Sequence, residues 1–177
     1  NFIDSDFVVI NQPLNQIYKL KLPEEERLPK GYLPIGIERD RRARPQEVFQ
    51  KVMLDEKSVR GGLLTQAGLL AMNSDGKDSH PLKRGIWLLE SLLNDPPSPP
   101  PAAVPEIDLS DPEILKMTLK ERMEDHRNDP ACFSCHAKVD PWGIAFENFD
   151  ATGSWRETIG DKPVDASSKL FHKQELN

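Results

Sequence analysis

The chain has 177 residues, of which 37% are hydrophobic and 29% charged, and it contains 16 prolines and a formal net charge of −6. This length suits one domain or two small ones, and the composition predicts a soluble, loop-rich protein. The acidic balance without a sustained basic stripe argues against nucleic acid as a partner. No apolar run approaches the roughly 18 residues of a transmembrane helix.

The first 59 residues predict little regular structure. Residues 1–22 are expected to begin extended and to continue as a short amphipathic helix, because apolar residues recur at helical spacing. Residues 23–45 hold four prolines and two glycines, which predicts an irregular segment. Residues 46–59 predict one short strand or helix. The chain starts at Asn1 rather than at methionine, so a processed product or a fragment is expected.

Residues 63–94 predict two helices joined by a polar loop. The first ends at the turn residues 73–76, and the second begins with Pro81 in its first turn. Lys83 and Arg84, also in that first turn, are expected either to face solvent or to balance a nearby anion. The predicted buried stripe of the second helix consists of Leu82, Ile86, Leu89 and Leu93.

Residues 96–105 contain six prolines in ten positions, which predicts a semi-rigid polyproline II connector. Residues 110–113, Ser-Asp-Pro-Glu, predict the start of a further helix. The chain is therefore divided into an N-terminal helical and irregular half at 1–95, a proline-rich connector at 96–109 and a C-terminal segment at 110–177. The two larger parts are expected to pack as one compact unit.

Residues 129–136 read DPACFSCH and contain both cysteines of the chain. On a helix that begins near Pro130, Cys132, Cys135 and His136 share one face, because residues i, i+3 and i+4 are neighbours there. C-x-x-C-H is an attachment signature for haem c, in which two thiols bond the vinyl groups and the imidazole binds iron. The sequence therefore predicts one covalently attached haem.

Three other interpretations of this cysteine pair compete with haem attachment. A thioredoxin-like redox pair would follow a strand, whereas residues 111–127 look helical. A structural zinc site needs four ligands, and beyond the cysteines only His136 and distant histidines remain. The third interpretation is an inert disulfide or a buried thiol pair. All three predict a colourless protein.

The helix is expected to end before Asp140-Pro141, and residues 140–143 are expected to form a turn. A carbonyl of this turn would accept the Nδ1 hydrogen of His136 and leave Nε2 for iron. Arg156 is a candidate partner for a haem propionate, and residues 157–177 are expected to be polar and frayed. The predicted apolar wall of the haem site consists of Ile144, Ala145, Phe149 and Trp155.

A second iron ligand is expected mainly from upstream, since no methionine follows His136 and the one later histidine, His172, lies in the polar tail. Met72 ranks first and His80 second, because both flank the loop between the two helices predicted at 63–94. An empty sixth position is the third possibility. Methionine ligation would suit electron transfer, whereas an open iron would bind a small ligand. The full set of upstream candidates is Met53, Met72, Met117, Met123, His80 and His126.

Three runs together resemble the haem-bearing segment of the large planctomycetal cytochrome c proteins. They are residues 60–68 (RGGLLTQAG), residues 79–87 (SHPLKRGIW) with the prolines at 96–101, and residues 126–156 (HRNDPACFSCHAKVDPWGIAFENFDATGSWR). The resemblance covers most of residues 1–165. Members are long, exported, multi-domain chains of poorly defined function, so it implies an extracytoplasmic or periplasmic location and a fragment of a longer protein. The attachment cysteines and proximal histidine of that family correspond to Cys132, Cys135 and His136.

The sequence thus predicts a mainly α-helical c-type cytochrome module with long, irregular, proline-rich connections. Its expected role is electron transfer to a redox partner protein or to neighbouring domains of a longer chain, rather than catalysis by itself. Two alternatives stay open. The first is a haem peroxidase-like or dehydrogenase-associated enzyme domain, and the second is a docking module in which the haem is structural.

Overall fold

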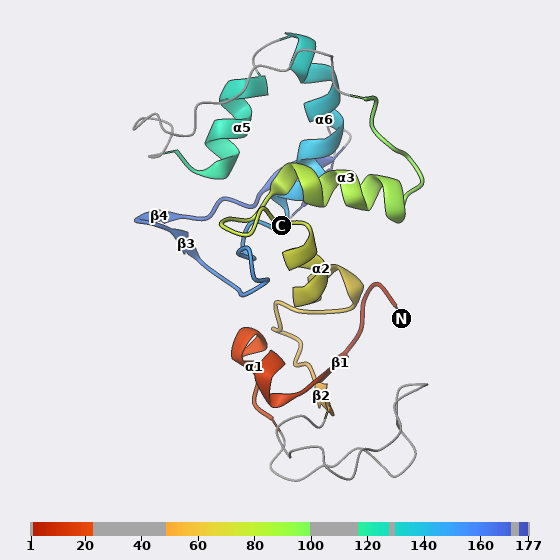
Figure 1. Ribbon diagram of the computed structural model, residues 1–177, viewed down its shortest axis with the longest axis vertical. Helices are drawn as coiled ribbons and strands as arrows, with labels where there is room; N and C mark the ends of the chain where they lie inside the picture. The colour runs from red at the N-terminus through yellow and green to blue at the C-terminus, as the bar shows by residue number, and fades with distance from the viewer. Residues whose placement is uncertain (1, 23–48, 100–116, 128–129, 171–173, 177) are drawn as a thin grey trace. The chain divides into compact units, whose positions relative to one another are not determined.

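The computed structural model describes residues 2–22, 49–99, 117–127, 130–170 and 174–176, whose helices and strands are drawn in Figure 1. The chain forms two compact units, one of residues 1–69 and 153–155 and the other of residues 70–152 and 156–177. The division predicted at 95 and 110 stays a prediction. The segment at 23–45, the helix start at 110–113 and most of the proline-rich connector lie outside the described residues.

The first unit contains a two-stranded antiparallel sheet and a short helix. Strand β1 (Phe7–Ile10) pairs with β2 (Gln50–Met53), and Val8 lies opposite Val52. Helix α1 (Gln12–Tyr18) begins after Asn11, whose side chain accepts the amide of Leu14 at 3.0 Å and so caps the first turn. These elements confirm the extended start and helix predicted for residues 1–22. Of the strand or helix predicted within residues 46–59, the structure has a strand at Gln50–Met53.

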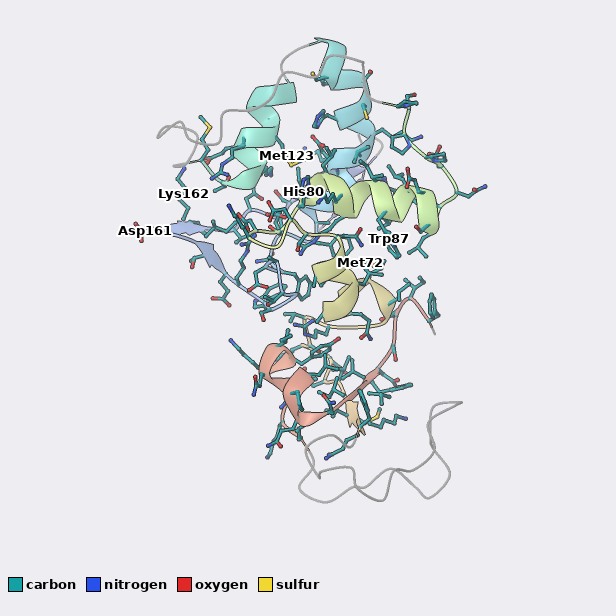
Figure 2. The ribbon with its side chains drawn as sticks, in the orientation of Figure 1. Met72, His80, Trp87, Met123, Asp161 and Lys162 are labelled. Atoms are coloured by element: carbon teal, nitrogen blue, oxygen red, sulfur yellow. The ribbon has the colours of Figure 1, made fainter. Side chains whose placement is uncertain are left out.

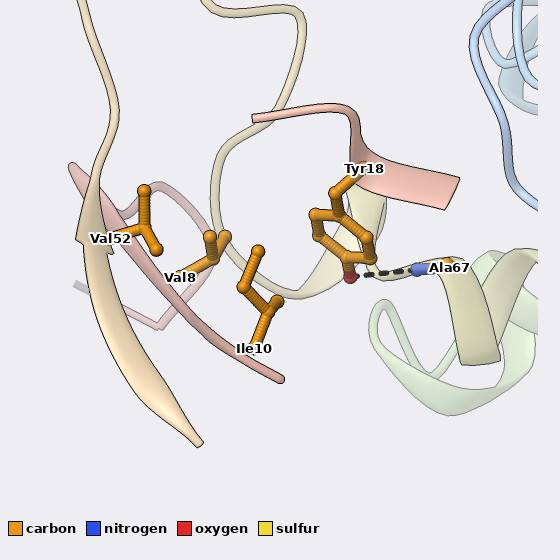
Figure 3. Packing of buried hydrophobic residues seen from close by; sticks show 5 residues of the cluster. All are labelled: Val8, Ile10, Tyr18, Val52 and Ala67. Atoms are coloured by element: carbon orange, nitrogen blue, oxygen red, sulfur yellow. Dashed lines mark hydrogen bonds between the residues drawn. The ribbon is translucent and has the colours of Figure 1, made fainter. Parts of the chain in front are cut away.

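A tyrosine occupies the centre of this unit. Tyr18 packs with Val8, Ile10, Val52 and Ala67, as Figure 3 shows. Ala67 is the first residue of helix α2 (Ala67–Met72), which follows the 3-10 turn η2 (Leu63–Thr65). Its hydroxyl donates to Oε1 of Gln66 at 2.8 Å and accepts from the amide of Ala67 at 3.1 Å. The buried phenol therefore keeps both of its hydrogen bonds.

Arg60 is a buried arginine that contacts Tyr18 and two backbone carbonyls within the first unit. Its guanidinium lies 4.1 Å from the centroid of the Tyr18 ring and donates to the carbonyls of Thr65 at 2.8 Å and Gly153 at 2.6 Å. The sequence marks Arg60 only as part of a break before two glycines. The side chain is instead buried. Local sequence patterns do not indicate this, because one of its acceptors lies 93 positions later in the chain.

Among its described residues, the second unit holds three longer helices and two small antiparallel hairpins. The helices are α3 (Pro81–Ser91), α5 (Leu119–Arg127) and α6 (Pro130–Ile144), and they are labelled in Figure 1. The hairpins pair β3 (Thr158–Ile159) with β4 (Lys162–Pro163) and β5 (Ser168–Leu170) with β6 (Gln174–Leu176). Among the described residues no helix is both long and apolar enough to cross a membrane.

The hairpins correct the prediction of a frayed tail at 157–177. Gly160, with φ of 58°, and Asp161 form a two-residue turn between β3 and β4, and Gly-Asp is a favourable sequence for such a turn. The polar composition concealed these strands because they are only two or three residues long and bury little apolar surface. Together with the helices they make a mixed structure, and the assignment to a cytochrome fold stays a prediction.

Two glycines allow α3 to approach α6 closely. A Cβ atom at Gly143 would lie 1.9 Å from the carbonyl oxygen of Pro81, and one at Gly85 would lie 2.5 Å from the carbonyl oxygen of Val139. No larger residue fits at either position without separating the helices. The C-terminal half of α6 is therefore covered by α3.

Candidate functional site

The predicted attachment residues lie together on α6. The helix begins at Pro130, as the sequence predicts, and the spacing of three and four residues places Cys132, Cys135 and His136 on one side of it. The two cysteines are partly buried thiols that form no disulfide. Residues 128–129, the predicted helix cap, lie outside the described residues. Two reduced sulfurs and one imidazole therefore face the same region.

The same face continues along the helix into the contact with α3. Cys132, His136, Val139 and Gly143 are separated by four, three and four residues, which is the spacing of one helical stripe. Val139 and Gly143 pack against α3, as described above. The candidate site therefore occupies the N-terminal half of this stripe, and the C-terminal half anchors it.

Asp140 holds the imidazole of His136. Its Oδ1 lies 2.9 Å from Nδ1 of His136, and the two residues are four apart on the same helix. The Asp140 side chain is 1% exposed and that of His136 is 13% exposed. With Nδ1 bonded to a carboxylate, Nε2 is the nitrogen that would bind iron. Sequence reasoning missed Asp140 in this role, although a carboxylate four residues after a histidine is a visible signal for such a pair.

Helix α6 runs through Pro141 to Ile144, so the predicted turn at 140–143 is wrong. Proline inside a helix removes one hydrogen bond and crowds the preceding turn, which usually costs about 3 kcal/mol. The contacts of α3 with Val139 and Gly143 offset this cost, and the carbonyl of Pro141 accepts a hydrogen bond from Ser168 Oγ at 2.7 Å. The hydrogen-bond partner of His136 Nδ1 is consequently the carboxylate of Asp140 on the helix and not a carbonyl of a turn.

Arg84, in the first turn of α3, is buried. It is 3% exposed, and its guanidinium donates to the carbonyls of Phe149 and Asp150 at 2.7 Å, of Phe146 at 2.9 Å and of Leu70 at 3.4 Å. Burial lowers its pKa to about 10, so it stays charged at neutral pH. Its neighbour Lys83 is exposed. The buried residues of α3 are Pro81, Arg84, Gly85, Leu88 and Leu89. Of the predicted stripe, Leu89 is buried, Leu82 and Ile86 are half-buried, and Leu93 is exposed.

A buried carboxylate pairs with a second arginine next to this cluster. Glu147 is 2% exposed, and its Oε2 accepts from Ser79 Oγ at 3.0 Å and from Arg156 at 3.3 Å. Arg156 also binds Asp78 at 2.9 Å. Burial raises the pKa of Glu147 to about 7, although the positive charge of Arg156 opposes the shift. Arg156 is thus committed to neighbouring side chains, not positioned for a propionate as the sequence predicts.

We expect the free energy of unfolding to fall as pH rises from about 5 to 7, because Glu147 loses its proton in this range. Its pKa rises from an ordinary 4.5 to about 7 in the folded state, so the folded chain holds more protons than the unfolded chain within this window. Urea unfolding at pH 5 and pH 8 measures the difference. In Glu147→Gln this difference should be smaller, and an identical pH response of the two proteins would contradict the assignment.

The first-ranked distal candidate, Met72, is the last residue of α2 and is 67% exposed. Figure 2 shows Met72 on α2, His80 at the start of α3 and Met123 on α5. Met123 is partly buried, and α5 packs beside α6. Met53 is 59% exposed and belongs to the first unit, and the side chain of His126 lies outside the described part of the structure. Ligation by Met72 stays a prediction.

The second-ranked candidate, His80, is the N-cap of α3. Its Nδ1 accepts the amide of Lys83 at 3.4 Å, and burial together with the charge of Lys83 lowers its pKa below the ordinary 6.5. Binding iron through Nε2 would move its proton to Nδ1 and remove the cap, a cost of about 1 kcal/mol. The residue after His80, Pro81, lies against Gly143 of α6. Gly143 is seven positions beyond His136, so His80 lies beside a part of α6 about 10 Å along the helix axis from His136. Its ligation also stays a prediction.

The donor set on α6 fits covalent haem attachment in its chemistry. Two reduced thiols at positions i and i+3 can each form a thioether, and the imidazole at i+4 has its Nδ1 oriented by a carboxylate. In the described residues, no group of three or more histidine, cysteine, aspartate and glutamate side chains is placed to hold a metal ion.

The comparisons with known proteins bear on this segment. No curated protein and no solved structure matches the chain. A family model described as PSCyt3, protein of unknown function (DUF1588), matches residues 60–159, which is 100 of the 177 residues. The match includes α3, α6 and the buried cluster of Arg84, Glu147 and Arg156, and the family carries a planctomycete cytochrome-associated name. The chain belongs to this PSCyt3 family.

Proposed function

We propose that this protein is a c-type cytochrome module that binds one haem covalently and transfers electrons. The observation that supports the proposal most is the placement of Cys132, Cys135 and His136 on one side of α6, with the imidazole held by Asp140 at 2.9 Å. Cys132 and Cys135 would form the thioethers, and His136 would bind the iron through Nε2. The attached haem would supply one-electron chemistry at the iron.

The attachment needs no oxidant. Each thiol adds across one vinyl group, so that the sulfur bonds to one carbon of the double bond and the hydrogen goes to the other. The reaction therefore needs both cysteines as reduced thiols, the state they have in the structure. The product weighs as much as the polypeptide plus one haem, with no loss of hydrogen.

The proposed partner is a redox protein or a neighbouring domain of a longer exported chain, and the proposed location is periplasmic or otherwise extracytoplasmic. Membership of the PSCyt3 family supports this context through its cytochrome-associated name. The enzyme alternative, a haem peroxidase-like or dehydrogenase-associated domain, differs in one measurable way. An open iron site changes its spectrum rapidly with peroxide or carbon monoxide, whereas a carrier with both axial positions filled does not.

Expression of the chain together with a haem-attachment system tests the proposal. We expect a red protein with a Soret band, a pyridine haemochrome spectrum of the c type and, after denaturation, the intact mass of the chain plus one haem. Expression without that system supplies the matched control and should yield the bare polypeptide. A colourless product of bare mass under both conditions would contradict the proposed function.

A further inference from the structure

A buried carboxylate beside His136, the proposed iron ligand, needs an explanation. Asp140 is 1% exposed, and burial of a charged group is costly unless a strong partner compensates it. One partner of Asp140 is His136, whose Nδ1 lies 2.9 Å from Oδ1 of Asp140. The pair belongs to a single helix, and its spacing of four residues holds the two side chains in register.

The course of α6 indicates that the hydrogen bond from His136 to Asp140 does more than orient the imidazole. A backbone carbonyl would hold the tautomer of His136 equally well, and a turn after His136 would supply such a carbonyl. Instead α6 continues through Pro141 despite its missing amide hydrogen, and this continuation keeps Asp140 on the helix face beside His136. The fold therefore places a carboxyl group, not a backbone carbonyl, behind the imidazole.

A carboxylate and a carbonyl differ in what they do to the donor nitrogen. When a carboxylate holds the Nδ1 hydrogen, His136 gains electron density and becomes a stronger donor through Nε2. A stronger donor stabilises the more positive state of a bound iron, which is the oxidised one. Hydrogen bonding to the axial ligand and burial are among the means by which a protein sets the reduction potential of a haem.

We propose that Asp140 is a positioning residue that sets a low reduction potential for the haem held by His136. This inference rests on the proposed function, because it concerns the same site. It identifies the partner by chemical class: the protein that reduces this module must be a correspondingly strong one-electron reductant. Glu147 provides a comparison, since it is an equally buried carboxyl group of the same unit, and it accepts hydrogen bonds from Ser79 and Arg156 instead of from a histidine.

Redox titration of the holoprotein and two variants tests the inference. Asp140→Asn keeps the size of the side chain and removes the charge, and we expect it to favour the reduced state at least tenfold, which is an upward shift of 59 mV for one electron. Glu147→Gln also replaces one buried carboxyl group and should shift the equilibrium less. A shift below tenfold in Asp140→Asn, or equal shifts in both variants, would overturn the inference.

A measurement on the unaltered holoprotein covers the case in which Asp140→Asn does not fold. The iron–imidazole stretching frequency of the five-coordinate ferrous form reports the donor strength of His136. Where a protein side chain fills the sixth position, the frequency is recorded transiently after photodissociation of that side chain. A value above that of a haem compound with neutral imidazole supports the inference, and an equal value overturns it. Loss of the Soret band in the unaltered protein would overturn the proposed function as well, whereas a normal spectrum with an unmoved potential overturns the inference alone.

Discussion

Replacing both cysteines by serine is expected to abolish covalent haem attachment. Cys132 and Cys135 are the two cysteines of the chain, and each supplies one thiol to the same side of α6. Serine has a similar size but adds far less readily to a vinyl group, so the double variant should show the mass of the bare polypeptide after denaturation. Each single variant should keep the haem through one thioether.

The matched control for this experiment is Ser134→Ala. Ser134 lies between the cysteines on α6 but is exposed, so its replacement leaves both thiols and the imidazole unchanged. We expect full attachment in this variant, measured by mass spectrometry and by extraction of non-covalent haem with acidified acetone. Covalent haem in the double serine variant would show that other residues form the links.

Replacing Arg84 by methionine is expected to lower the free energy of unfolding by about 3–5 kcal/mol, the cost of breaking a buried charged network. The guanidinium donates to four carbonyls, three of which belong to the segment 146–150 after α6. Methionine fills the space but offers no donor, so these carbonyls lose their partner. Urea unfolding followed by circular dichroism measures the loss.

Lys83→Met is the matched control, because it makes the same substitution one position earlier in the same helical turn. Lys83 is exposed and donates to the carbonyl of Ser74 at 3.2 Å, an exposed interaction. Its loss should change the free energy of unfolding by no more than about 0.5 kcal/mol. Equal destabilisation by the two substitutions would show that the buried hydrogen bonds of Arg84 contribute little.

Local signals predicted the ends of three helices correctly. The helix expected to run from residues 110–113 is an exception, because residues 117–118 are not helical and α5 begins at Leu119. Pro81 opens α3, Pro130 opens α6, and the turn beginning at Asn73 ends α2. The placement of Cys132, Cys135 and His136 on one side follows from their spacing alone. These features depend on the geometry of a single turn of helix, so the sequence contains all the information they need.

The errors concern residues whose partners are distant. From its own helix, Arg84 is expected either to face solvent or to balance an anion, but most of its acceptors are carbonyls 62 to 66 positions later. Arg156 likewise binds Asp78, which precedes it by 78 positions. The continuation of α6 through Pro141 depends on packing against Gly85 of α3, which no local rule for proline includes. Tertiary contacts therefore decided the buried charges and the helix end.

Pro141 has a consequence for the dynamics of the site. Because proline has no amide hydrogen, the ladder of hydrogen bonds along α6 is interrupted at the turn that contains Ala137 and Asp140. The segment bearing the two thiols can consequently open on its own, while Val139 and Gly143 keep the other end docked on α3. If haem is attached as proposed, a helix interrupted in this way would present its cysteines to the attachment machinery without requiring the rest of the unit to unfold.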